Sequence, residues 1–507
     1  MMKLQPSKSL TKDQTESGLK LVIADGMTAE AMVVFTSGTF LTAMAISLGA
    51  TNFQLGLFAA LPTFTTIFQL VAIWLVQRFN NRRVITSIFN LLARLPIIAI
   101  GLMPFLFTRG TSVQVLLLLL FFQHIFGDIA GASWNSWVKD LVPEKQLGVF
   151  FSRRSRMAQT LNVTLSLATA FGIDYIKAHY PSQEIITYNI LFLIGGGLGL
   201  LSVGFLLRTP EPRAKKINRK LLTLFTLPLR NRNFKNLLAF NSVWAFALNL
   251  ATPFFSVYLL KTLGMPLSYV ISLGILSQLS GILSFKLWGQ YTDRFSNKTI
   301  LSICAPLYAF CILFFAFTAM PTTWLGRLGL LVLIYLVSGW SVAGINLALS
   351  NIGLKLASKN EAIAYLSVKN MFAAFFSTIA PLVGGLLADF FSSHQFNWNM
   401  QFISTTSVTN FTLVNLRGWN YFFIFGGLLA LLSLRLLKLV REPGEVDKMR
   451  AIIHLRADFR KTLRNRFGRQ VADHVYLPAI IARRRSKKLL KQKRYSAFPV
   501  LPDKNLT

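Results

Sequence analysis

Four ionisable side chains lie within long apolar stretches of the sequence: Glu30, near the start of the first stretch, and Arg94, His124 and Asp128, further inside theirs. If such stretches cross a bilayer, each charge costs about 2.5–3.5 kcal/mol on insertion scales and needs a partner, water or a function. His124 and Asp128 are one helical turn apart, where they could titrate or meet a cationic ligand. No grouping with cysteine or further histidine indicates a metal, a cofactor or a catalytic residue.

Two of these charges fall at matching depths. At 1.5 Å per residue, Arg94 and Asp128 both lie about 14–15 Å from the same edge of their helices. A structural ion pair between neighbouring helices and a functional role for Asp128 both fit this placement. Glu30 is either a proton-coupling carboxylate or a first-turn acid stabilised by the helix dipole.

The elements that carry these residues are membrane spans. The chain has 507 residues, of which 53% are hydrophobic and only 14% charged, a composition too apolar for a soluble globular protein. A helix needs about 20 apolar residues to cross the hydrocarbon core. The sequence predicts twelve such spans, at residues 27–48, 54–76, 84–107, 113–137, 157–176, 185–207, 237–260, 267–287, 299–320, 328–349, 367–390 and 421–439.

The strong positive charge follows the membrane topology. Lys and Arg number 53 against 19 Asp and Glu, a formal charge of +34, which in a soluble chain would indicate a nucleic-acid partner. Here the basic residues concentrate in alternate loops and in the last stretch, as expected when positive charge is retained in the cytoplasm. We therefore expect no nucleic-acid partner and both termini in the cytoplasm. The compact loops favour the cytoplasmic membrane of a bacterium.

One membrane-embedded unit occurs twice. Arg78-Phe79-Asn80-Asn81-Arg82 and Arg294-Phe295-Ser296-Asn297-Lys298 stand between apolar runs, 216 residues apart. Gly49 and Gly264 repeat at 215, as do Asp174 and Asp389. Such a register predicts two similar halves.

These features resemble the major facilitator superfamily of secondary transporters. Gly289, Asp293, Arg294 and Lys298 match the family's loop signature after the eighth span, whereas the first copy keeps Arg78 and Arg82 but has Gln77 in place of the acid. In the family this loop resembles a latch at the cytoplasmic side. The resemblance implies that these residues form a gating loop. Because Gln77 weakens the latch in the first copy, Asp293 in the second copy is expected to contribute more to it.

The resemblance also implies an all-α polytopic membrane protein with two pseudo-symmetric six-helix bundles. The expected parts are a disordered cytoplasmic start (1–23), a first bundle (24–207), a basic linker (208–236), a second bundle (237–440) and a basic amphipathic tail (441–507). In the family the first, fourth, seventh and tenth helices line the cavity. Substrate or coupling residues are then expected among Glu30, Thr36, His124, Asp128, Asn135, Asn241, Trp244, Asn249 and Asn346.

The implied function is alternating-access transport of a small solute by a monomer, with proton coupling open. The tail carries apolar residues every three to four positions beside basic clusters, a pattern that favours binding to the anionic inner leaflet. Two alternatives stay open at this point. One is a transporter-like sensor or scaffold that works through its tail, and the other is a membrane enzyme acting on a lipid-linked substrate.

Overall fold

The computed structural model describes most of the chain up to residue 442. The described residues are 6–7, 10–106, 112–143, 146–213, 228–320, 323–356, 362–392, 395–403 and 408–442, with 445, 449 and 453. The first compact unit covers Met1–Pro443, and Gly444–Thr507 form a second. The predicted tail helix and residues 214–227 of the basic linker fall outside the described residues.

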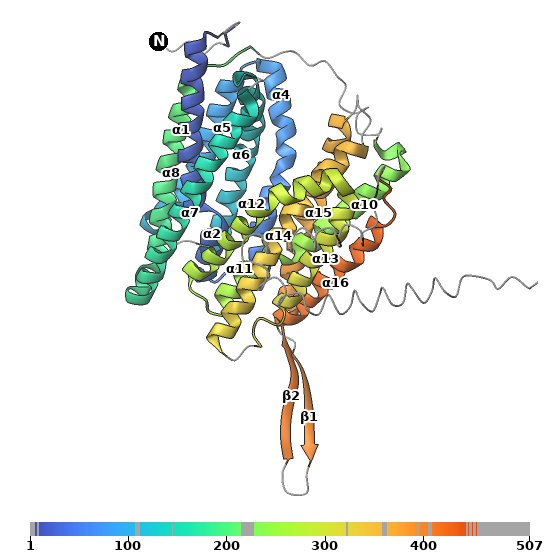
Figure 1. The fold of residues 1–507 in the computed structure, drawn as a ribbon. Helices are drawn as coiled ribbons and strands as arrows, with labels where there is room; N and C mark the ends of the chain where they lie inside the picture. The colour runs from blue at the N-terminus through green and yellow to red at the C-terminus, as the bar shows by residue number, and fades with distance from the viewer. Residues whose placement is uncertain are drawn as a thin grey trace, which may run out of the picture. The chain divides into compact units, whose positions relative to one another are not determined.

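The first half of the chain folds into one group of packed helices (Figure 1). Helices α1, α5, α6, α7 and α8 run alongside one another, and α4 packs on α6. The elements of this half are α1 (Lys12–Thr36), α2 (Gly38–Ser47), α3 (Asn52–Phe64), the 3₁₀ turn η1 (Thr65–Phe68), α4 (Gln69–Phe79), α5 (Arg82–Leu106), α6 (Val113–Leu141), α7 (Leu147–His179), η3 (Pro181–Gln183) and α8 (Glu184–Arg208).

The second half repeats this plan. Helix α10 packs on α15 and α16, α13 packs on α14 and α16, and α12 packs on α14. The elements are η4 (Pro228–Arg230), α10 (Arg232–Ala251), α11 (Phe254–Val257), the π-helical η5 (Tyr258–Thr262), α12 (Leu267–Phe295), α13 (Asn297–Phe315), α14 (Trp324–Leu356), α15 (Ala362–Ser392) and α16 (Trp419–Leu437).

Several predicted spans are broken helices. The first bends between α1 and α2, where Gly38 has φ +60°, a left-handed conformation that costs glycine little. The second passes through η1 three residues after Pro62, whose ring removes a helix hydrogen bond. The seventh is interrupted before α11 at Pro253.

Within the described residues, eleven spans are long and apolar enough to cross a membrane. The remaining expected span, the fifth, corresponds to α7, which has 33 residues but is not among the eleven. Its first half carries Arg153, Arg154 and Arg156, and polar side chains such as Asn162 continue beyond them. The fold is therefore an all-α membrane fold of eleven to twelve long helices.

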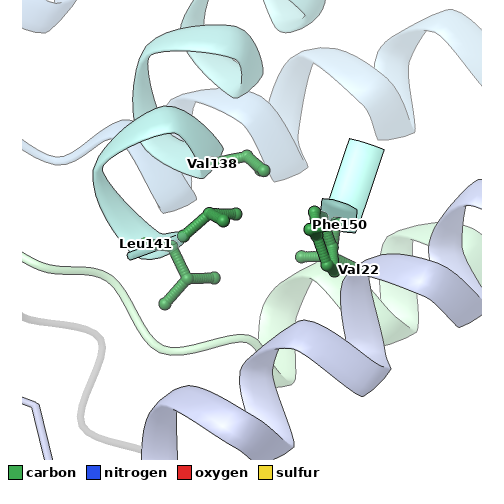
Figure 2. Close-up of a cluster of buried hydrophobic side chains, with 5 residues drawn as sticks. Val22, Val138, Leu141 and Phe150 are labelled. Carbon is green, nitrogen blue, oxygen red and sulfur yellow. The ribbon is translucent and has the colours of Figure 1, made fainter. Parts of the chain in front are cut away.

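The chain start is more ordered than the sequence predicts. Helix α1 begins at Lys12, because Thr11 and Gln14 form a reciprocal capping box. Further along, Val22 joins a buried apolar cluster with Val138, Leu141, Val142 and Phe150 (Figure 2). The prediction of a disordered segment over 1–23 is wrong for residues 12–23, since cap and packing together stabilise the helix.

The two ends of the helical unit differ. We call one the basic end, where residues 77–83, 208–213 and 295–299 lie, and the other the hairpin end, where residues 48–52, 180–184 and 263–267 lie. At the hairpin end, strands β1 (Gln395–Ile403) and β2 (Val408–Arg417) pair antiparallel and extend beyond the helices (Figure 1). The sequence assigned this loop no structure, so the hairpin is a new element.

Candidate functional site

One buried carboxylate is surrounded by polar and charged groups from three other helices. Asp25 on α1 is 4% exposed, and the Ser202 hydroxyl of α8 donates a 2.6 Å hydrogen bond to its Oδ1. Arg94 of α5 and Arg154 of α7 interact electrostatically with the same carboxylate. Two guanidinium groups thus face a single acid inside the first bundle, and we call Asp25, Arg94, Arg154 and Ser202 the Asp25 cluster.

Two glycines make room for these arginines. A Cβ at Gly26 would lie 2.6 Å from Nε of Arg154, and a Cβ at Gly199 would lie 2.6 Å from Cδ of Arg94. Both distances are shorter than any ordinary contact, so glycine at each position lets an arginine lie against the helix backbone. The Arg154 guanidinium also stacks over the Trp134 ring at 4.8 Å, a favourable cation–π geometry.

The Asp25 cluster contains donors that lack acceptors. Among the described residues, Nε of Arg94 and Nε of Arg154 are buried without a hydrogen-bond partner. Arg94 does donate through Nη2 to Asn90 at 3.1 Å. Unpaired buried donors are costly, and a bound carboxylate or phosphate oxygen is the kind of group that satisfies them.

The predicted ion pair between Arg94 and Asp128 does not form. Asp128 instead accepts hydrogen bonds from Thr65 at 2.6 Å and Gln69 at 3.1 Å, both on the second span. The depth of a residue along a helix axis does not determine the direction in which its side chain points. Packing on α8 turns Arg94 towards Asp25, while Asp128 faces η1 and α4.

Three other predicted residues of the first bundle have local partners. Glu30 accepts a 2.7 Å hydrogen bond from Asn162 of α7. Thr36 is buried and donates to the carbonyl of Met32, one turn back in its own helix. His124 lies within electrostatic reach of Asp128, as the one-turn spacing predicts. None of the three belongs to the Asp25 cluster.

The predicted residues of the second bundle do not form one group. Asn249 of α10 donates to Ser377 of α15 at 3.0 Å, a bond between neighbouring helices. Asn241 and Trp244 are buried, and their Nδ2 and Nε1 atoms have no partner among the described residues. Asn346, like Asn135 in the first bundle, is exposed.

A carboxylate caps a helix at the basic end of the first bundle. Glu211 accepts hydrogen bonds from the backbone N–H groups of Arg82 and Arg83, at 2.8 and 3.1 Å, where α5 begins. The Arg82 side chain also binds Glu211 at 3.3 Å and Asp140 at 2.6 Å. A negative charge at a helix N-terminus is favourable because it pairs with the exposed N–H groups and the dipole.

The second bundle repeats this arrangement. Glu442 accepts from the N–H groups of Asn297 and Lys298, at 3.3 and 2.7 Å, where α13 begins. The Lys355 ammonium adds a 2.9 Å ion pair. Burial alone would raise the pKa of Glu442, but the hydrogen bonds from Lys298, Lys355 and Asn297 outweigh it and hold this pKa below its usual value.

Comparison with known proteins decides the family. The family model described as Major Facilitator Superfamily matches residues 26–353. The chain belongs to the major facilitator superfamily. It is therefore a secondary transporter of small solutes and an integral multi-pass membrane protein, and the expectation from the loop signature is confirmed. Because the superfamily consists of transporters rather than enzymes, the membrane-enzyme alternative falls away.

Solved structures of several transporters share the fold at low sequence identity. A point mutant of the nucleoside transporter NupG aligns with TM-score 0.64 and 13% identity, covering 84% of this chain and 100% of that one. A D-xylose–proton symporter aligns with TM-score 0.59 and 16% identity, covering 85% and 99%. A POT family transporter in complex with 5-aminolevulinic acid aligns with TM-score 0.58 and 12% identity, covering 86% and 99%. No curated protein sequence matches the chain.

The signature residues of this superfamily member have mixed surroundings. Arg82 is buried in the Glu211 network, and the Lys298 N–H binds Glu442. Gln77 and Arg78 are exposed. Arg294 is also exposed and lies over the Phe295 ring at 5.2 Å, and nothing lies within 4 Å of a Cβ added at Gly289. The Asp293 side chain is outside the described residues.

Sequence reasoning missed three acids of this transporter: Asp25, Glu211 and Glu442. A signal for two of them was present, because a Glu-Pro pair follows the sixth span at Glu211-Pro212 and the twelfth at Glu442-Pro443. Asp25 had a weaker sequence signal, since it stands close to the polar start of the chain. Its burial became evident only from the packing of α1 against α8.

Proposed function

We propose that the protein is a proton-coupled, alternating-access transporter in which Asp25 is the coupling carboxylate. One observation carries the proposal: a single buried acid faces two arginines from different helices. When Asp25 is ionised, it neutralises part of the surrounding positive charge. When it takes up a proton, Arg94 and Arg154 lose their counter-ion in a low-dielectric setting and need another.

The solute that fits this exchange carries an anionic group. Arg94 and Arg154 each have an unpaired Nε donor, and guanidinium groups bind planar oxyanions well. Proton binding at Asp25 and anion binding at the arginines would then favour one another. The proton and the solute would therefore cross the membrane together, in the same direction. Trp134, already stacked with Arg154, supplies an apolar face beside the charges.

Glu30, Asp128 and His124 are the rival coupling groups. Each has a fixed local environment: Glu30 with Asn162, and Asp128 with Thr65, Gln69 and nearby His124. In the described part of the chain, the contacts of these three groups include no guanidinium group that proton binding would release. Asn135, Asn241, Trp244, Asn249 and Asn346 remain proposed as contributors to a mildly polar solute path.

The test begins with ligand discovery on purified protein. Thermal stabilisation is measured against pairs of solutes that differ only as carboxylate and amide, because selective binding to the folded state raises the melting temperature. Any stabilising solute is then followed into proteoliposomes under an imposed pH gradient. We expect carboxylates to stabilise, and we expect the gradient to drive uptake.

Substitutions assign the coupling residue. Asp25→Asn should abolish pH-driven accumulation while solute exchange between equal compartments continues. Glu30→Gln and Asp128→Asn serve as matched controls that remove one carboxylate each and should keep accumulation. Gradient-driven accumulation that survives in Asp25→Asn would refute the assignment to Asp25. A preference for amides over carboxylates would refute the anionic solute class.

We also propose that the basic end faces the cytoplasm of a bacterium, with both termini there, and that the protein works as a monomer. The basic tail would bind anionic lipid of the inner leaflet through electrostatic attraction. Neutralising residues 483–488 in the full chain should weaken binding to anionic but not to neutral vesicles. Uptake that survives removal of residues 446–507 would contradict the sensor or scaffold alternative.

A further inference from the structure

Two carboxylates at the hairpin end bind helix N-termini of the opposite bundle. Asp174 on α7 accepts hydrogen bonds from the backbone N–H groups of Leu267 and Ser268, at 2.9 and 2.8 Å, the first residues of α12. Asp389 on α15 accepts from Asn52 and Phe53, at 3.3 and 3.0 Å, the first residues of α3. In each case the acid belongs to one bundle and the capped helix to the other.

The two contacts are copies of one another. Asp174 and Asp389 are 215 residues apart, and so are Asn52 and Leu267, where the capped helices begin. Exchanging the two bundles therefore exchanges the two contacts. Two equivalent contacts thus join the bundles at the hairpin end, and full separation of the bundles there requires both contacts to break.

The rest of the interface supports closure at the same end. Helices α3 and α15 approach so closely that a Cβ at Gly385 would lie 2.7 Å from the Asn52 carbonyl oxygen. Nearby, the Thr378 hydroxyl donates to Thr63 across the interface at 3.1 Å. At the basic end the corresponding acids, Glu211 and Glu442, bind helices of their own bundle. Among the described residues, carboxylate caps thus join the bundles at the hairpin end alone.

If the Asp174 carboxylate separated from the N-terminus of α12, it would still have polar surroundings. It lines a cavity of about 360 Å³ at the hairpin end, together with Ser47, Lys177, Glu184 and Leu267. A cavity of this size can hold water, which can solvate a carboxylate that leaves its helix. The free-energy cost of breaking the contact is therefore only the difference between a carboxylate bound to the helix N-terminus and a carboxylate solvated by water. A cost of this kind suits a contact that opens and closes repeatedly.

We propose that Asp174 and Asp389 are a symmetric pair of reversible gate locks that hold the hairpin end closed and release together when it opens. The inference rests on the alternating access proposed above but not on proton coupling or on the solute. Its test measures distances between bundles without any solute. It can therefore fail while transport and coupling stand.

The experiment uses spin-label distance measurements on the full chain in lipid nanodiscs. The buried cysteines Cys304 and Cys311 are first replaced by alanine to give a background free of thiols. One label pair reports on the hairpin end, at the exposed positions Tyr180 and Leu325. A second pair reports on the basic end, at the exposed positions Val149 and Leu439.

The variants are Asp174→Ala, Asp389→Ala and the double substitution. Each single variant should raise the ratio of open to closed hairpin ends about two- to fivefold, the range that a charge at a helix N-terminus supplies. In the double variant, the ratio should rise by roughly the product of the increases in the two single variants. Distances at the basic end should shorten in parallel, because opening one end of a rocking pair closes the other.

A matched control separates the locks from general loosening. Glu184 lines the same cavity, but it binds Ser47 and Lys177 of its own bundle, so Glu184→Gln should leave both distributions unchanged. If the double alanine variant does not fold, Asp174→Asn with Asp389→Asn keeps the side-chain volume and should give the same shift, smaller in size. Unchanged distances at the hairpin end, or broadening at both ends without the reciprocal shift, would overturn the proposal.

Discussion

Glu211 and Glu442 occupy equivalent positions in the two bundles. Each carboxylate accepts hydrogen bonds from the first two N–H groups of a helix, α5 in one case and α13 in the other. Each also binds a basic side chain of its own bundle, Arg82 or Lys355. At the basic end, each of these acids therefore caps a helix of its own bundle, and each follows the last helix of that bundle in the chain.

The first prediction concerns the buried pair of Glu211 and Arg82, whose side chains are both about 1% exposed. Glu211→Ala leaves the Arg82 charge with Asp140 alone and uncaps α5, so stability should fall by about 3–5 kcal/mol. Asp140→Asn removes the half-exposed partner and should cost about 1 kcal/mol or less. Thermal unfolding of the purified variants measures both, and equal losses would contradict the proposed hierarchy.

The second prediction is a pH dependence that arises from Glu442. Its pKa in the folded protein lies below the ordinary value of about 4.3. A carboxyl with a lowered pKa contributes stability above its unfolded pKa, and this contribution is lost as the pH falls through the folded value. The melting temperature of Glu442→Gln should therefore lie below that of the wild type at pH 7 and approach it in acid below pH of about 4. A difference that stays constant over this range would rule out the ionised form as the source.

The third prediction tests whether the arginines of the Asp25 cluster need glycine beside them in order to pack against the helix backbone. Gly199→Ala would push against Cδ of Arg94, and Gly26→Ala against Nε of Arg154. Overpacking of this kind costs about 1–3 kcal/mol, and displacement of either guanidinium should also reduce transport. Gly197→Ala is the control on the same helix as Gly199, because nothing lies within 4 Å of its added Cβ. Transport rates and melting temperatures unchanged in all three variants would contradict the packing argument.

The fourth prediction uses the contact between Thr63 and Thr378, whose hydroxyl oxygens are 3.1 Å apart across the bundle interface. In the cysteine-free background, Thr63→Cys with Thr378→Cys should form a disulfide on mild oxidation, since such proximity suits disulfide geometry. The cross-link should stop transport by holding the interface closed, and a reductant should restore it. Either single cysteine variant should respond to neither reagent. Full transport by the oxidised, cross-linked protein would show that this interface does not open during the cycle.

Much of the fold follows from local sequence. The apolar stretches, the basic loops and the repeat that relates Arg78 to Arg294 were sufficient for a membrane protein of two similar halves, because a bilayer accepts only helices that satisfy their own backbone groups. The sequence did not predict that the first and second spans are broken near Gly38 and Pro62. Both residues were visible, but whether a glycine or proline bends a membrane helix depends on its neighbours.

The site depended on tertiary packing. Sequence alone placed Arg94 and Asp128 at one depth, yet the side chains point to different neighbours, since only packing determines which face of a helix meets which partner. Asp25 looked like part of a polar chain start until α8 covered it. The repeat of Asp174 and Asp389 was legible from the first reading of the sequence. Only the folded chain revealed that each acid caps a helix of the opposite bundle, because that contact joins segments far apart along the chain.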